Sequence, residues 1–145
     1  MVKADSMSKT HEISYRVYYE DTDAGGVMYH ANHIKFCERG RTEFLRSLNM
    51  QNSDLYAENG VLFVVRKLEA DYFKPAKLDD LLCVQTKLLT VKNTSFLMQQ
   101  DLLKDGETLF SMKVLLVTIN TSGKPTPLPD QVKNLFKDYT ELSPI

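Results

Sequence analysis

The sequence has few of the features that mark secreted, membrane-spanning or metal-binding proteins. Only 2 of its 145 residues are cysteine, and Cys37 and Cys83 lack the C-x-x-C spacing of a redox or zinc motif. We expect both to be reduced and buried, as is typical of a cytoplasmic protein. No run of about 18 apolar residues is present, so no transmembrane helix is expected.

The balance of charge argues against binding of nucleic acid or of acidic membranes. The formal net charge is −1, which gives no overall field to attract nucleic acid or an acidic membrane. Neither is therefore an expected partner. Residues 1–10 lack the apolar segment that a signal peptide requires. We expect them to form a disordered lead-in. The length predicts one domain over residues 11–138, followed by a tail over 139–145.

Apolar periodicity predicts one strand at the start of this domain and four more in its second half. Apolar and polar residues alternate over 12–18, which is the period of a half-buried strand. The same period returns at Leu68 and continues to about Ile119. Turns are expected at 74–76, at 92–94 and at the hairpin signal Asp105-Gly106. Strands joined by such short turns pair antiparallel.

A long amphipathic helix is predicted between these two groups of strands. Apolar residues over 34–48 share one face for about four turns, and His33 is expected on the exposed surface. Gly40 should cost the helix about 0.5–1 kcal/mol relative to alanine, so we expect a strand to approach closely there. Short helices are predicted from Ser53 and from Pro129.

These elements together predict an α+β fold. A long helix with a single apolar stripe needs a sheet to lie on, so we expect a curved antiparallel sheet wrapped around it. Such a sheet leaves edge strands unpaired, and pairing two edges across a dimer would cover them.

The stretch between the first strand and the long helix carries most of the chemistry. It reads YEDTDAGGVMYHANH over residues 19–33. A calcium loop would need oxygen ligands at positions where this stretch has none. His30 and His33 have no third ligand at the spacing of a zinc site. No metal is therefore expected, and an ordinary turn, with Glu20 and Asp21 holding the loop, is the structural alternative.

The position of this stretch before a helix favours catalysis. Free N–H groups at a helix start and the helix dipole favour negative charge, so a carbonyl that becomes an oxyanion would be stabilised there. Gly25 and Gly26 would let a ligand approach the backbone. Asp23 would stand beside that carbonyl as general base or nucleophile. This combination suits acyl-group hydrolysis without a metal or a serine.

Residues 18–32 resemble the signature of the 4-hydroxybenzoyl-CoA thioesterase family of hotdog-fold proteins, in particular its YbgC-type, Tol–Pal-associated acyl-CoA thioesterases of bacteria. The similarity continues through FCERGRTE (36–43), FVVRK (63–67) and YFKPAKLDD (72–80). It implies a hotdog fold, homodimers or homotetramers, and an active site between two subunits. It also implies hydrolysis of short- to medium-chain or aromatic acyl-CoA to free CoA and a carboxylic acid. CoA is then part of the substrate, and no cofactor is implied.

The resemblance assigns roles near the helix start. The catalytic carboxylate falls on Asp23. The residue whose backbone N–H polarises the thioester carbonyl falls on His30, whose imidazole would also orient water or stabilise charge. Val27, Met28 and Tyr29 are expected to contact the substrate, although Tyr29 would also suit a plain core position.

The resemblance places the CoA nucleotide at a turn between two strands, residues 91–95. Lys92 and Ser95 are the candidates there, and Arg66 is a further one. Residues 63–65 would line the acyl channel, although burial alone would also explain their apolar character.

Two other functions stay open. An acyl-carrier-protein thioesterase would share the chemistry but bind an acidic protein. A non-catalytic hotdog protein would bind acyl groups or act as an adaptor, although such a binder would need neither Asp23 nor His30.

Overall fold

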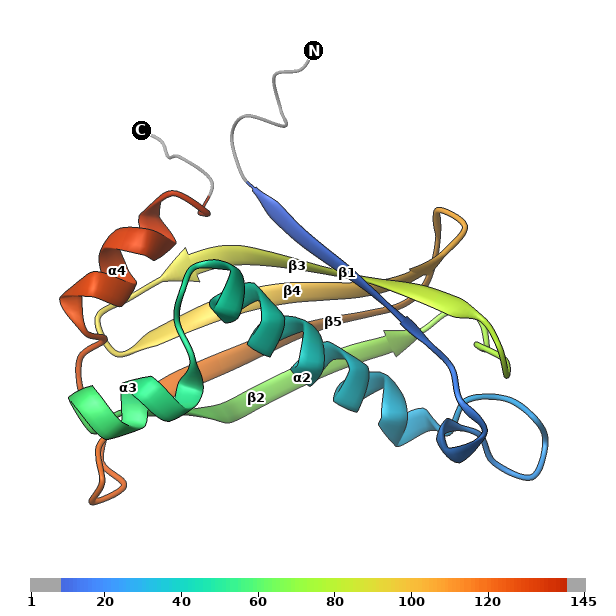
Figure 1. Ribbon diagram of the computed structural model, residues 1–145, viewed down its shortest axis with the longest axis horizontal. Coiled ribbons are helices and arrows are strands. Elements are labelled where there is room, and N and C mark those ends of the chain that lie inside the picture. The colour runs from blue at the N-terminus through green and yellow to red at the C-terminus, as the bar shows by residue number, and fades with distance from the viewer. Residues whose placement is uncertain (1–8, 141–145) are drawn as a thin grey trace, which may run out of the picture.

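A computed structural model describes residues 9–140, so the predicted lead-in up to residue 8 and the tail from residue 141 lie outside the described residues. The chain forms a five-stranded sheet curved around one long helix (Figure 1). The helix is α2 (His30–Ser47). The other elements are β1 (Thr10–Arg16), the 3-10 turn η1 (Tyr19–Asp21), α3 (Asn52–Asn59), β2 (Leu62–Tyr72), β3 (Leu81–Val91), β4 (Ser95–Lys104), β5 (Glu107–Ile119) and α4 (Asp130–Lys137). The predicted α+β class and element order are confirmed.

The strands are ordered β1-β3-β4-β5-β2, and every neighbouring pair is antiparallel. The hairpin expected at Asp105 and Gly106 joins β4 to β5, and their φ angles of 50° and 83° suit the type I′ turn. β2 begins earlier than predicted, at Leu62. Residues 62–65 are a continuous apolar run that conceals the strand period, and the register shifts between Val65 and Lys67.

The long helix α2 packs on the concave side of the sheet against β1, β3 and β4. Its buried face includes Phe36, Cys37 and Phe44. Burial raises the pKa of the Cys37 thiol to about 12, so it stays protonated. Cys83 is only half-buried, contrary to prediction, because alternate residues of β3 face outward. No helix in the described part of the chain is long and apolar enough to span a membrane.

Gly40 lies where the helix meets β3, as predicted. A Cβ atom at this position would come within 2.5 Å of Val84 Cγ1. Real Cβ contacts are never that short, so only glycine allows the helix and the strand to approach so closely. The cost of a mid-helix glycine is offset by this packing.

We expect Gly40→Ala to destabilise the protein. Helix propensity alone would favour alanine by about 1 kcal/mol, whereas overpacking typically costs about 1–3 kcal/mol, and the contact at Val84 makes the second effect dominate. Urea denaturation measures the free energy of unfolding. In a protein that also carries Val84→Ala, Gly40→Ala should lower the free energy of unfolding by less, because the Val84 methyl group that would clash is absent. A Gly40→Ala protein more stable than its parent would contradict the close approach.

Candidate active site

The buried carboxylate of Asp21 holds the loop between β1 and α2. Its Oδ2 atom accepts a hydrogen bond from the Tyr18 N–H at 2.9 Å, and its Oδ1 atom accepts one from the Asn32 side-chain amide at 2.9 Å. Its carbonyl oxygen accepts the Tyr29 N–H at 2.8 Å. Three hydrogen bonds therefore tie this one residue to both sides of the loop, which fixes the loop against the first turn of the helix.

The first turn of α2 presents free backbone donors. Tyr29 is the N-cap, and the Asn32 N–H is bonded to the Tyr29 carbonyl. The N–H groups of His30 and Ala31 find no hydrogen-bond acceptor within residues 9–140. They are the donors that a helix start offers to an anion or a carbonyl oxygen. The helix start therefore suits the predicted oxyanion site.

Asp23 lies in the closed loop that leads into this helix start. An isolated bridge pairs Thr22 with Met28, so the loop closes on itself and returns to α2 (Figure 1, lower right). The Asp23 carboxylate is exposed, and its Oδ1 atom accepts the Gly25 N–H at 2.9 Å. Gly26, with a φ of 81°, makes the turn. The predicted carboxylate and the predicted N–H donor thus lie at the same end of the molecule.

The neighbouring predicted residues differ in their surroundings. Tyr29 is 46% exposed and lies against the His30 imidazole, with the ring centroids 4.6 Å apart, so a core role for Tyr29 is excluded. Met28 is 4% exposed and packs in the hydrophobic core, so its contact with a substrate stays a prediction. Val27 is half-buried and bridges to Lys77.

His33 is buried beneath the helix start, and its predicted surface position is wrong. It is 3% exposed, and its ring packs against those of Tyr72 and Phe110 at 4.9 and 5.1 Å. The long Tyr72 side chain reaches over the helix and donates a hydrogen bond to the His30 carbonyl oxygen at 2.7 Å. The face of α2 that carries His33 is therefore covered by the C-terminal end of β2.

The predicted phosphate-binding residues gather on the outer face of the sheet. Arg66, Lys92 and Ser95 line one cavity of about 360 Å³ together with Lys113. Lys92 also borders a second cavity, of about 540 Å³, whose other cations are Lys133 and Lys137 of α4. Sequence reasoning did not identify Lys113, Lys133 and Lys137, because only strand pairing and the position of α4 bring them close to Lys92.

The two groups of predicted residues lie at opposite ends of the sheet. Tyr72, which contacts the helix start, pairs with Phe110 on β5, whereas Ser95 pairs with Val117. From residue 110 to residue 117 the strand rises by about 24 Å. The helix start also lies on the concave side and the cations on the outer face. A single chain therefore does not bring Asp23 close to Lys92.

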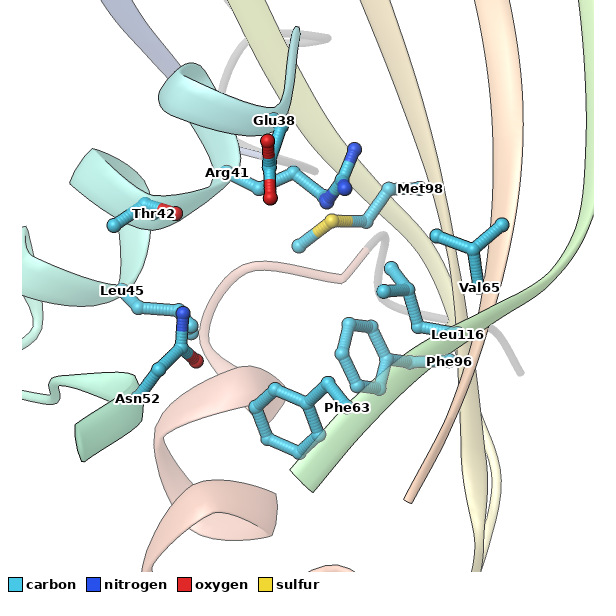
Figure 2. A pocket seen from close by; sticks show the side chains of 10 residues that line it. All are labelled: Glu38, Arg41, Thr42, Leu45, Asn52, Phe63, Val65, Phe96, Met98 and Leu116. Carbon is cyan, nitrogen blue, oxygen red and sulfur yellow. The ribbon is translucent and has the colours of Figure 1, made fainter. Parts of the chain in front are cut away.

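A third cavity, of about 150 Å³, lies between α2 and the concave face of the sheet (Figure 2). Phe63 and Val65 line it, as expected of an acyl channel, whereas Val64 is not among its lining residues. Val64 and Val65 are 38% and 47% exposed, so burial does not account for their apolar character. The remaining lining residues are Glu38, Arg41, Thr42, Leu45, Asn52, Phe96, Met98 and Leu116. Sequence reasoning assigned no role to Arg41.

Among the described residues, no group of three or more histidine, cysteine, aspartate or glutamate side chains is arranged to hold a metal ion. The groups present at the helix start and in the loop before it are a carboxylate, an imidazole and backbone N–H donors.

Residues 17–136 match the model of a thioesterase-like superfamily. The chain is 45% identical over 122 residues to the acyl-CoA thioesterase YbgC of Haemophilus influenzae. The aligned region covers 83% of this chain and 90% of that protein. It is 44% identical over 124 residues to the acyl-CoA thioester hydrolase YbgC of Escherichia coli, over 84% of this chain and 92% of that one.

Solved structures share the architecture. A probable thioesterase from Bartonella henselae superimposes with a TM-score of 0.81 at 40% sequence identity. The superposition covers 83% of this chain and 100% of that one. A 1,4-dihydroxy-2-naphthoyl-CoA thioesterase from Synechocystis superimposes with a TM-score of 0.83 at 21% identity, over 90% of this chain and 97% of that one, and shows the fold alone.

We expect acid to destabilise the fold through His33. Burial lowers the pKa of His33 below its ordinary value of 6.5, so the unfolded chain binds the proton at a higher pH than the folded chain. The stability contributed by neutral His33 is present above about pH 6.5 and is lost as the pH falls through the folded pKa. Urea denaturation at about pH 7.5 and about pH 5 measures this loss, which should shrink in His33→Gln. An equal loss in parent and variant would exclude His33 as its source.

Proposed function

The chain belongs to the thioesterase-like superfamily, among the YbgC-type proteins of the 4-hydroxybenzoyl-CoA thioesterase family, and we propose that it hydrolyses acyl-CoA thioesters. The acyl groups are short to medium in length, aromatic ones included. The observation that carries the proposal is an exposed Asp23 carboxylate in the loop that leads directly into the unbonded N–H groups of His30 and Ala31. The reduced cysteines accord with a cytoplasmic location.

The helix start binds the reacting carbonyl. Its oxygen accepts the His30 N–H, and the positive end of the helix dipole stabilises the negative charge that develops on it. This stabilisation is strongest in the tetrahedral transition state, so it raises the rate more than it strengthens binding of the substrate. The exposed His30 imidazole, beside Tyr29, orients the attacking water.

Asp23 supplies the group that starts the reaction. As a general base it takes a proton from water while the water oxygen attacks the carbonyl carbon. As a nucleophile it attacks that carbon itself, and water then hydrolyses the mixed anhydride. In both routes the C–S bond breaks, one water molecule is consumed, and the products are free CoA and a carboxylic acid. The hydrogen bond from the Gly25 N–H orients the carboxylate for either role.

A second copy of the chain completes the site. β2 is an edge of the sheet, and it exposes Val64 and Val65 as well as its unpaired backbone. We infer that two copies pair antiparallel along β2 about a twofold axis, as dimers or within tetramers. In such a pair the two β2 strands run in opposite directions. The Tyr72 end of β2 in one copy, which contacts the helix start, therefore lies beside the Leu62 end in the partner. That end of the partner's sheet carries its 91–95 turn. CoA phosphates would then contact the partner's cations.

Asp23→Asn should lower kcat by about 10²–10⁴-fold with little change in the melting temperature, because it removes the base or nucleophile and leaves the Gly25 hydrogen bond. Release of free thiol from acetyl- to palmitoyl-CoA and from benzoyl-CoA measures the rate. Asp54→Asn, an exposed carboxylate on α3, is the matched control and should keep full activity. A retained rate in Asp23→Asn would refute the mechanism. A wild type that cleaves carrier-protein thioesters in place of CoA thioesters would favour the carrier-protein function.

Mixed dimers test the division of the site between copies. Asp23→Asn and the double variant Arg66→Glu/Lys92→Glu should each be inactive at low substrate concentration. When they are co-expressed with different affinity tags and purified as mixed dimers, one of the two sites holds an intact Asp23 and intact cations. Roughly half of the wild-type activity per dimer should return. Mixed dimers without activity would show that each chain uses its own cations.

A further inference from the structure

Half-buried Arg41 is anchored to a buried hydrogen-bonded network. Its Nη1 atom donates to Gln100 Oε1 at 3.1 Å. Gln100 is fully buried, and its Nε2 atom donates to the Cys37 carbonyl oxygen at 2.8 Å and to Thr86 Oγ1 at 2.9 Å. The guanidinium therefore stands at a fixed position on the wall of the 150 Å³ cavity beneath α2.

This cation lacks a matched anion. Within residues 9–140, no carboxylate forms an ion pair with Arg41. A guanidinium carries five N–H donors, and Gln100 accepts from one nitrogen. Burial, the largest influence, lowers the pKa of Arg41, while the nearby charge of Glu38 opposes that change. Arg41 is half-buried and lines the cavity, and its guanidinium keeps N–H donors beyond the one that Gln100 accepts. It can therefore bind an oxygen acceptor that a ligand brings into the cavity.

The other residues that line the cavity indicate the size and polarity of a ligand that would bring this acceptor. Phe63, Phe96, Met98 and Leu116 form its sheet side, and Arg41 and Thr42 lie on the helix side (Figure 2). A cavity of about 150 Å³ holds a molecule of about the size of benzene, roughly six non-hydrogen atoms. The expected guest is therefore short, apolar along its length and ends in an oxygen acceptor.

The cavity lies where the proposed dimer would bring a reacting acyl group. It adjoins β2 at Phe63 and Val65, near the N-terminal end of that strand. The helix start contacts Tyr72, at the C-terminal end. Antiparallel pairing of β2 brings these two ends together across the twofold axis, so a thioester held at one copy's helix start points its acyl group toward the partner's cavity.

We propose that this cavity binds the distal end of the acyl group and that Arg41 selects acyl groups ending in a carboxylate. The substrate class is then the CoA monothioester of a short dicarboxylic acid, a conclusion that rests on the proposed thioesterase function. A guanidinium pairs with a carboxylate through two parallel hydrogen bonds, stronger than those to neutral groups. The exposed Glu38 is screened by solvent and opposes this pairing only weakly.

Two thioesters of nearly equal shape test the proposal. Glutaryl-CoA ends in a carboxylate, and 5-methylhexanoyl-CoA ends in an isopropyl group of similar size. We expect kcat/KM to favour glutaryl-CoA in the wild type. Arg41→Met should lower the ratio of kcat/KM for glutaryl-CoA to that for 5-methylhexanoyl-CoA by about 10- to 100-fold. Arg41→Lys should lower this ratio by a smaller factor, because lysine keeps the positive charge. Arg39→Met, on the exposed side of the same helix, is the matched control and should keep the wild-type ratio.

Glu38→Gln provides a variant with a gain of function. Removing the neighbouring negative charge should raise the ratio by about 3-fold, because the repulsion of the bound carboxylate is gone. A wild-type ratio near or below one, or a ratio unchanged in both Arg41→Met and Glu38→Gln, would overturn the proposal and leave the thioesterase function standing.

Binding without turnover separates the two hypotheses. In Asp23→Asn, titration calorimetry should show tighter binding of glutaryl-CoA than of 5-methylhexanoyl-CoA, and adding Arg41→Met should abolish the difference. If the wild type hydrolyses no thioester but this difference is present, the function is wrong and the selective cavity stands. If there is turnover and no difference in binding, Arg41 does not select a carboxylate. Melting temperatures near that of the parent verify that the variants are folded.

Discussion

The close approach of α2 to β3 at Gly40 determines where everything else in the molecule lies. Because no side chain separates the helix from Val84 at this point, the helix axis is pressed onto the β1, β3 and β4 half of the sheet. Gln100 reinforces the same position by binding the Cys37 carbonyl. The helix start, with its free N–H groups, is therefore fixed by packing in the middle of the helix, many residues away.

The same off-centre position leaves part of the other half of the concave face uncovered, at the N-terminal end of β2. β2 and β5 contact the start of α2 through Tyr72 and Phe110, whereas farther along the helix they are separated from it by the cavity at Arg41, and β2 keeps an exposed apolar edge. One packing constraint thus positions the free N–H groups at one end, a cavity along the flank of the helix and an exposed edge strand. The proposed hydrolysis, selection of the acyl group and assembly would all depend on where the helix lies on the sheet.

The parts of the fold that could be predicted depend on local signals. The hairpin at Asp105-Gly106 and the packing role of Gly40 follow from backbone chemistry that a few neighbouring residues specify. Asp23 and His30 could be named as candidates because one short stretch of sequence carries both. His33 could not, because its burial depends on Tyr72, which arrives from a distant strand. Arg41 and the lysines around Lys92 were missed for the same reason, since strand pairing alone brings their partners close.

The pairing of β1 with β3 has a consequence for the order in which the protein folds. Thr10 pairs with Lys87, so this contact closes a much longer stretch of chain than the β3–β4 and β4–β5 hairpins do. Closing a long loop costs more entropy than closing a hairpin, and such contacts form late. The loop of Asp23 hangs between β1 and α2 and is complete only when β1 has docked. We therefore expect a nascent chain to bring the Asp23 carboxylate into its final position in a late folding step, when β1 pairs with β3.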